Sequence, residues 1–88
     1  MITLAEVQSD TEGVYEGLLL ADGFDDAFIG VGQQFNNLVG VYNKDKCLSI
    51  LKDQGMSYEE ALEYFDFNVT GSYVGPQTPI FMLSNHFV

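Results

Sequence analysis

The sequence predicts an α+β domain in which a three-stranded, mainly antiparallel sheet packs against an αα-hairpin, with an additional N-terminal helix. Two observations predict this class. Apolar residues alternate with others over 27–34, as in a half-buried strand, and then recur at helical spacing over 44–54 and 57–70. The chain has 88 residues, a length that suits a single domain over 1–88.

The N-terminal helix is expected over 10–21. Ser9 and Glu12 have the spacing of a capping box, in which a hydroxyl and a carboxylate satisfy backbone N–H groups at a helix start. Apolar residues follow at helical spacing: Val14, Tyr15, Leu18, Leu19 and Ala21. Gly13 and Gly17 oppose the helix, since each costs about 1 kcal/mol relative to alanine.

The middle of the chain predicts a β-hairpin. After the alternating strand 27–34, a second β-rich run follows over 38–42. Asn36 and Asn37 lie between the two runs, and asparagine tolerates the positive φ that a tight turn needs. We therefore expect these two residues to form the turn.

The αα-hairpin follows directly. Asn43 is expected to cap the helix over 44–54, and Gly55 to end it. Ser57 and Glu60 form a second capping box for the helix over 57–70. The apolar face of this second helix is expected to comprise Tyr58, Ala61, Leu62, Phe65 and Val69.

A final strand is expected over 79–83. Pro79 stands at its first position, where the missing N–H does least harm, so we place this strand at a sheet edge. The last 22 residues carry no charged group besides His86 and are rich in apolar side chains. An apolar edge of this kind favours a homodimer through the tail.

The charge balance excludes several functions. Thirteen Asp and Glu stand against three Lys and no Arg, which gives a net charge of −10. Direct nucleic-acid binding is disfavoured, because it depends on clustered Lys and Arg. No apolar run reaches the roughly 18 residues that span a bilayer, and no signal-peptide pattern follows Met1. We expect a cytoplasmic protein that binds neither nucleic acid nor membrane.

Cysteine and histidine each occur once. Cys47 has no disulfide partner, and its neighbours Leu48, Ile50 and Leu51 place it on an apolar helical face. We interpret it as a buried structural thiol. A Cys47–His86 pair carries no family signature.

A series of motifs gives one resemblance. The motifs are Asp22-Gly-Phe-Asp-Asp-Ala-Phe-Ile-Gly-Val31, Val39-Gly-Val-Tyr42, Lys46-Cys47, Met56-Ser-Tyr-Glu-Glu-Ala61, Glu63-Tyr-Phe-Asp-Phe-Asn68 and Gly75-Pro-Gln-Thr-Pro-Ile-Phe81. Over 22–83 the chain resembles a family of short, uncharacterised proteins common in bacteriophage genomes and prophages. The resemblance implies a phage-type origin and action in the host-cell cytoplasm, and it brings no catalytic residue, metal or cofactor.

Two groups of acidic residues are the candidate partner-binding sites. One group shares the exposed side of the second predicted helix, and the other lies in the loop before the first predicted strand. The residues are Glu59, Glu63 and Asp66 in the first group, and Asp22, Asp25 and Asp26 in the second. On the helix these like charges repel one another, and no nearby Lys is expected to relieve them.

The leading hypothesis is a small, non-enzymatic binding protein that covers a basic surface of a host protein. For the acidic helix face taken alone, the pattern favours an ordinary solvated surface over a partner-binding one. A self-associating structural protein is a second class. A small enzyme is a third, using either Cys47–His86 or a cation held by Asp22, Asp25 and Asp26, although their spacing does not match an EF-hand loop.

Overall fold

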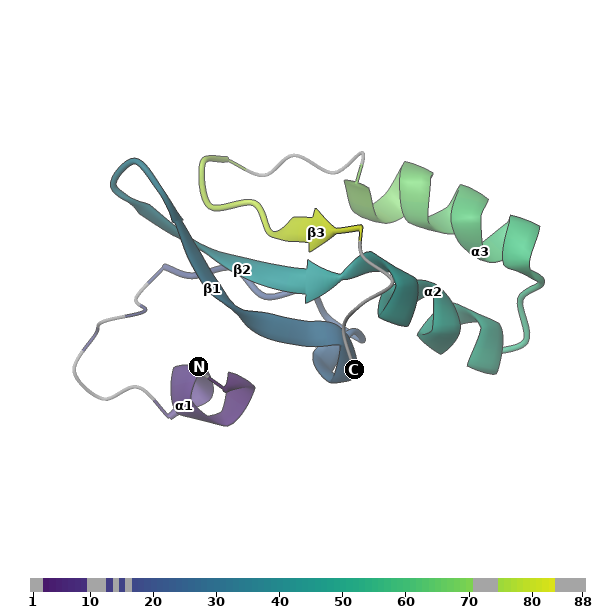
Figure 1. Cartoon of the computed structure of the whole chain (residues 1–88), viewed down its shortest axis with the longest axis horizontal. Helices are drawn as coiled ribbons and strands as arrows, with labels where there is room; N and C mark the ends of the chain where they lie inside the picture. The colour runs from purple at the N-terminus through teal and green to yellow at the C-terminus, as the bar shows by residue number, and fades with distance from the viewer. Residues whose placement is uncertain (1–2, 10–12, 14, 16, 71–74, 84–88) are drawn as a thin grey trace.

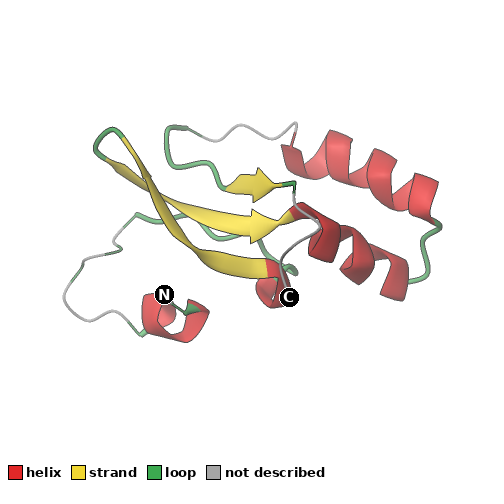
Figure 2. Ribbon diagram, viewed as in Figure 1, coloured by secondary structure: helices red, strands yellow, loops and turns green. Residues whose placement is uncertain are grey.

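The structure is a computed structural model that describes residues 3–9, 13, 15, 17–70 and 75–83. It confirms the α+β class. The elements in chain order are α1 (Leu4–Gln8), the 3-10 helix η1 (Asp25–Ala27), β1 (Phe28–Gln34), β2 (Asn37–Asn43), α2 (Lys44–Asp53), α3 (Tyr58–Phe65), the π-helix η2 (Asp66–Thr70) and β3 (Ile80–Met82). Figures 1 and 2 show α2 and α3 side by side, beyond the end at which β2 and β3 finish.

The sheet has the order β1-β2-β3, with all three strands within one or two residues of their predicted bounds. β1 and β2 pair antiparallel, with a bulge between Phe28 and Gly30. β2 and β3 pair parallel, Tyr42 opposite Phe81. A parallel neighbour requires a long crossover connection, which α2 and α3 provide here. The final strand therefore lies at an edge of the described sheet, as predicted.

The hairpin turn differs from the prediction by one residue. Gln34 pairs with Asn37, so the turn consists of Phe35 and Asn36 rather than of Asn36 and Asn37. Phe35 takes the positive φ of 55° that this tight turn demands. A bulky side chain rarely adopts that conformation, which is why the sequence pattern pointed to the asparagines instead.

The caps of α2 and α3 are confirmed. The Asn43 side chain accepts a hydrogen bond from the Lys46 backbone N–H (3.2 Å). Gly55 has a φ of +102°, and the N–H groups of Gly55 and Met56 donate to the carbonyls of Lys52 and Leu51, as in a Schellman motif. This left-handed glycine ends α2 and lets the chain turn back into α3.

Ser57 and Glu60 form the predicted capping box. The Glu60 backbone N–H donates to Ser57 Oγ (3.2 Å), and the Ser57 N–H donates to Glu60 Oε1 (3.1 Å). The hydrogen bond from the Ser57 backbone is the main reason that the pKa of Glu60 is lowered. The helix predicted over 57–70 is α-helical only to Phe65 and then continues as the π-helix η2.

Replacing Ser57 with alanine should lower the free energy of unfolding by about 1 kcal/mol, because the Glu60 N–H loses its side-chain acceptor. Urea unfolding followed by circular dichroism measures this loss. Ser49→Ala is the control, since Ser49 is exposed inside α2, where alanine favours the helix. Equal losses in both variants would show that the capping box does not stabilise the fold.

The N-terminal helix predicted over 10–21 is wrong for its described part. A short helix, α1, lies earlier, and its first turn is capped by Thr3. Gly13 and Gly17 have φ angles of 76° and 81°, which a right-handed helix cannot contain, and 18–21 is not helical. Residues 10–12, 14 and 16 lie outside the described residues.

Tyr42 explains why the segment before η1 runs as it does. The Ala21 backbone N–H donates to the Tyr42 hydroxyl (2.8 Å), which fixes the segment beside β2. At Gly40 a Cβ atom would come 3.2 Å from the Leu19 carbonyl oxygen, so glycine permits the chain to pass close over the strand. A helix would hold the Ala21 N–H in its own ladder instead.

The core lies where the sheet meets the helix pair. Its fully or nearly buried residues are Phe24, Ala27, Tyr42, Cys47, Leu48, Leu51, Ala61 and Phe65. Phe65 makes edge-to-face contacts with Phe24 and Phe81, at centroid distances of 6.1 and 4.9 Å. The predicted apolar face of α3 is confirmed at Ala61, Leu62, Phe65 and Val69, while Tyr58 is exposed, contrary to the prediction.

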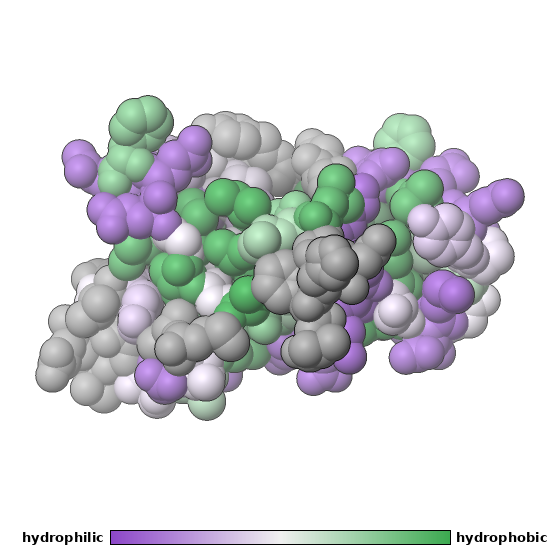
Figure 3. All heavy atoms as spheres, viewed as in Figure 1, coloured by the Kyte–Doolittle hydropathy of each residue, from purple (hydrophilic) through white to green (hydrophobic). Residues whose placement is uncertain are grey.

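The outer surface combines apolar and polar regions. On the face in Figure 3, hydrophobic residues gather over the sheet, between hydrophilic residues at the hairpin turn and over the helices. Among the described residues, no helix has the length and apolar composition needed to cross a bilayer.

Candidate functional site

The six predicted partner-binding residues are all exposed and lie in two places. Glu59 and Glu63 are on α3, and Asp66 begins η2. The other three, Asp22, Asp25 and Asp26, lie in the turn before η1 and in η1 itself. Phe24 packs against Phe65 of α3, so the core anchors this second acidic loop while its carboxylates stay in solvent.

Asp66 has a basic neighbour, which corrects the prediction that no Lys relieves the acidic helix face. Lys44 Nζ lies 3.6 Å from Asp66 Oδ1 and 5.4 Å from the centroid of the Phe65 ring. Lys44 begins α2, and the antiparallel packing of the helix pair brings that end beside the end of α3. The two residues are far apart in sequence, so helical spacing did not reveal the contact.

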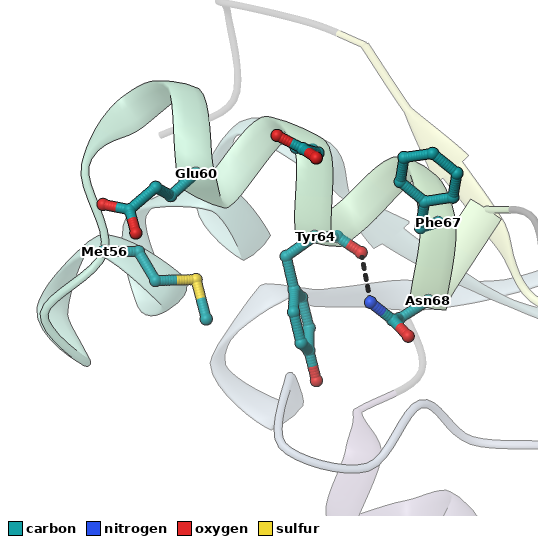
Figure 4. A pocket seen from close by; sticks show the side chains of 6 residues that line it. Met56, Glu60, Tyr64, Phe67 and Asn68 are labelled. Atoms are coloured by element: carbon teal, nitrogen blue, oxygen red, sulfur yellow. Dashed lines mark hydrogen bonds between the residues drawn. The ribbon is translucent and has the colours of Figure 1, made fainter.

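Glu63 belongs to a different surface, with no ion-pair partner among the residues that the structure describes. This surface is a shallow groove along the outer side of α3 and η2, which we call the acidic-aromatic groove. It is lined by Met56, Glu60, Glu63, Tyr64, Phe67 and Asn68 (Figure 4). Tyr64 and Phe67 are 43% and 76% exposed, so their rings are available to a ligand.

Local structure places these side chains. The capping box holds Glu60 at the start of α3, and Met56 extends from the preceding loop toward the side on which Tyr64 lies (Figure 4). Asn68 Nδ2 donates to the Tyr64 carbonyl (3.2 Å), joining η2 to α3. Residues of opposite character stand four apart, Glu60 with Tyr64 and Glu63 with Phe67, and therefore share a side of the helix.

Sequence reasoning missed this combination. It identified the exposed acidic residues but did not join them with the rings of Tyr64 and Phe67 into one groove. The offset of four between an acid and an aromatic residue was the available signal. What spacing does not show is that Asn68 lines the groove from the π-helix η2 and that Met56 lines it from the loop before α3.

A second hollow lies across η2 from this groove. It is mainly apolar and is bordered by the segment before η1, by η2 and by the approach to β3. Asn68 lines both hollows, and Asp22 lines the second one. Glu63 and Asp22, one residue from each predicted acidic group, thus line different hollows that share Asn68.

The residues weighed for enzymatic chemistry are placed differently. Burial raises the pKa of the fully buried Cys47 thiol to about 12, so the thiol is protonated at neutral pH, and its predicted burial is confirmed. His86 lies outside the described residues. Within 3–9, 13, 15, 17–70 and 75–83, no three His, Cys, Asp or Glu side chains gather as a metal site would require.

The predicted tail interface is described only in part. Ile80, Met82 and Leu83 are 43%, 37% and 75% exposed, and 84–88 lies outside the described residues. The homodimer through the tail stays a prediction.

Comparison of the chain with protein-family models, with curated proteins and with solved structures found no match. The phage-type resemblance therefore rests on the motifs over 22–83 alone.

Proposed function

We propose that this chain is a non-enzymatic binding protein whose acidic-aromatic groove receives Lys or Arg side chains from a basic surface of a partner protein. The groove joins two carboxylates, Glu60 and Glu63, to the exposed rings of Tyr64 and Phe67. Carboxylates attract a cation, and aromatic faces attract it further through the ring quadrupole.

One contact within the chain carries this proposal. Lys44 Nζ already lies between a carboxylate, Asp66, and an aromatic face, Phe65, on the same helical segment. The groove offers the same two kinds of group, a carboxylate and a ring, at Glu63 with Phe67 and at Glu60 with Tyr64, without an internal cation among the described residues. A basic side chain of a partner would occupy there the position that Lys44 occupies beside Asp66.

The remaining features support a basic protein partner. With a net charge of −10, the chain attracts basic surfaces over about one Debye length, roughly 10 Å at 0.1 M salt. Met56 adds a flexible apolar side chain that adapts to the aliphatic stem of Lys or Arg. The second acidic group, Asp22, Asp25 and Asp26, would extend the contact across η2. Following the resemblance, the partner would be a host protein in the cytoplasm of an infected cell.

Binding of a short Lys- and Arg-rich peptide, measured by calorimetry, tests the groove. We expect Glu63→Gln and Tyr64→Ala each to raise Kd about threefold to fivefold, because an exposed cation–π contact contributes about 0.5–1 kcal/mol and an exposed ion pair up to about 1 kcal/mol. Raising the salt from about 0.05 to about 0.5 M should weaken binding further.

Glu6→Gln is the matched control for this measurement. It removes the same charge from α1, which Figure 1 places at the opposite end of the molecule from α3. Its Kd should change less than twofold. If all three variants bind alike, net charge rather than the groove attracts the peptide, and the proposal fails. If Glu63→Gln and Tyr64→Ala do weaken binding and Glu6→Gln does not, a pull-down from host lysate at both salt concentrations is the next step toward the natural partner.

A further inference from the structure

The β-hairpin is one of two long stretches of the chain without charge, the other being the C-terminal residues after Asp66. None of the residues in 27–43 is Asp, Glu, Lys or Arg, although the whole chain carries −10. In Figure 1 the turn of the hairpin projects away from the helix pair, so the groove and the hairpin turn lie at different ends of the molecule. Two copies of so acidic a chain can approach most closely where neither carries charge.

The hairpin also has an open strand edge. Within the described residues β1 pairs with β2 alone, which leaves the backbone groups along its other edge without a strand partner. β1 has 7 residues, and it contains neither Pro nor Lys, the residues that commonly protect an edge. The bulge near Phe28 limits the regular part of this edge to Gly30–Gln34.

The other edge of the sheet is less suited to pairing. β3 has 3 residues and follows Pro79 directly. A strand this short offers few ladder hydrogen bonds, and the proline removes one donor beside it. Edge pairing through β1 would therefore form the longer ladder.

We infer that β1 is a self-association edge, at which a second copy of the chain pairs antiparallel through its own β1 to make a continuous six-stranded sheet. Antiparallel pairing of identical strands closes about a two-fold axis, so it gives a dimer rather than a filament. It also places the hairpin turn of each copy beside the base of the other hairpin, where Asp25 and Asp26 lie. The side chains that meet those carboxylates are neutral amides, Gln33, Gln34 and Asn36.

This arrangement predicts how a charge added at the hairpin turn changes the dimer constant. Gln34 is exposed, so charging it leaves the monomer core intact. Gln34→Glu would set a carboxylate near Asp26 of the other copy and weaken the dimer about tenfold, whereas Gln34→Lys would strengthen it by a similar factor. Gln54→Glu and Gln54→Lys, at the exposed end of α2, change the net charge equally and should each alter the dimer constant less than twofold.

Sedimentation of the full chain from about 10 µM to about 1 mM measures this constant. The dimer should tighten as salt rises, because screening relieves the repulsion between acidic copies, which is opposite to the salt response expected of the groove. Amide hydrogen exchange of the unaltered chain should show slower exchange in 28–34 at high concentration.

Three results would overturn the inference. They are a monomer throughout the concentration range, equal effects of the Gln34 and Gln54 variants, and added protection in 80–82 instead of 28–34. Added protection in 80–82 would place the contact between the two copies at β3 and the tail. Each of these outcomes leaves the peptide measurement on the groove unaffected, so the two proposals fail separately.

Discussion

Phe65→Ala should lower the free energy of unfolding by about 3–5 kcal/mol, the range for removing a buried phenylalanine. An 88-residue domain has a total stability of about 4–13 kcal/mol, so this single change should remove at least about a quarter of it, and all of it at the low end of that range. Urea unfolding followed by circular dichroism measures the loss.

The size of the effect follows from where the ring lies. Phe65 is fully buried and contacts Phe24 of the loop before η1 and Phe81 of β3, while Lys44 lies over its face. Phe81 in turn contacts Tyr42 at 5.7 Å between centroids. One ring thus links the helix pair to the sheet and to the loop that carries the second acidic group.

Phe67→Ala is the matched control, since Phe67 is two residues away in the same helical segment and 76% exposed. Its loss should stay below about 0.5 kcal/mol. Phe65→Leu keeps most of the buried volume and should lose about 1.5 kcal/mol, which gives a measurable value if the alanine variant does not fold. Similar losses at 65 and 67 would contradict the described packing.

The parts of the fold that depend on local signals were predictable. The capping box at Ser57, the cap at Asn43 and the stop at Gly55 depend on residues that hydrogen-bond within a few positions, so their spacing identifies them. The alternation of β1 is likewise local. The failed N-terminal helix shows the limit, because Gly13 and Gly17 take positive φ where the pattern favoured a helix. The distant Tyr42 hydroxyl then fixes Ala21 outside any helical ladder.

The candidate site was predictable only as two unrelated halves. Charge and apolar spacing each mark one side of α3, but the groove also needs Met56 from a loop and Asn68 from a π-helix. A π-helix leaves no periodic signal in five residues. The Lys44–Asp66 contact was hidden for a different reason, because it depends on how two helices pack rather than on sequence separation.

Cys47 should make the protein less stable as the pH rises above about 9. Burial raises the pKa of the folded thiol from its ordinary value of 9.0 to about 12. Between these values the unfolded chain loses the thiol proton and the folded chain keeps it, so ionisation favours unfolding. The free energy of unfolding should fall by up to about 1.4 kcal/mol per pH unit from this group. Below about pH 8 the thiol is protonated in both the folded and the unfolded chain, so its contribution to the free energy of unfolding no longer changes with pH.

Urea unfolding at pH values from about 8 to about 10 measures this slope, and Cys47→Ala should have a shallower one. The slopes are compared rather than the stabilities, because alanine also leaves a small cavity beside Leu48 and Leu51. Above about pH 10 the buried Tyr42, whose pKa desolvation also raises, would add to the fall in the free energy of unfolding in both chains.

Iodoacetamide gives an independent check on the unaltered protein. A protonated, enclosed thiol reacts only through open states, so alkylation in buffer at pH 8 should be at least about a hundredfold slower than in urea. Comparable rates in the two conditions would show that Cys47 is accessible in the folded chain.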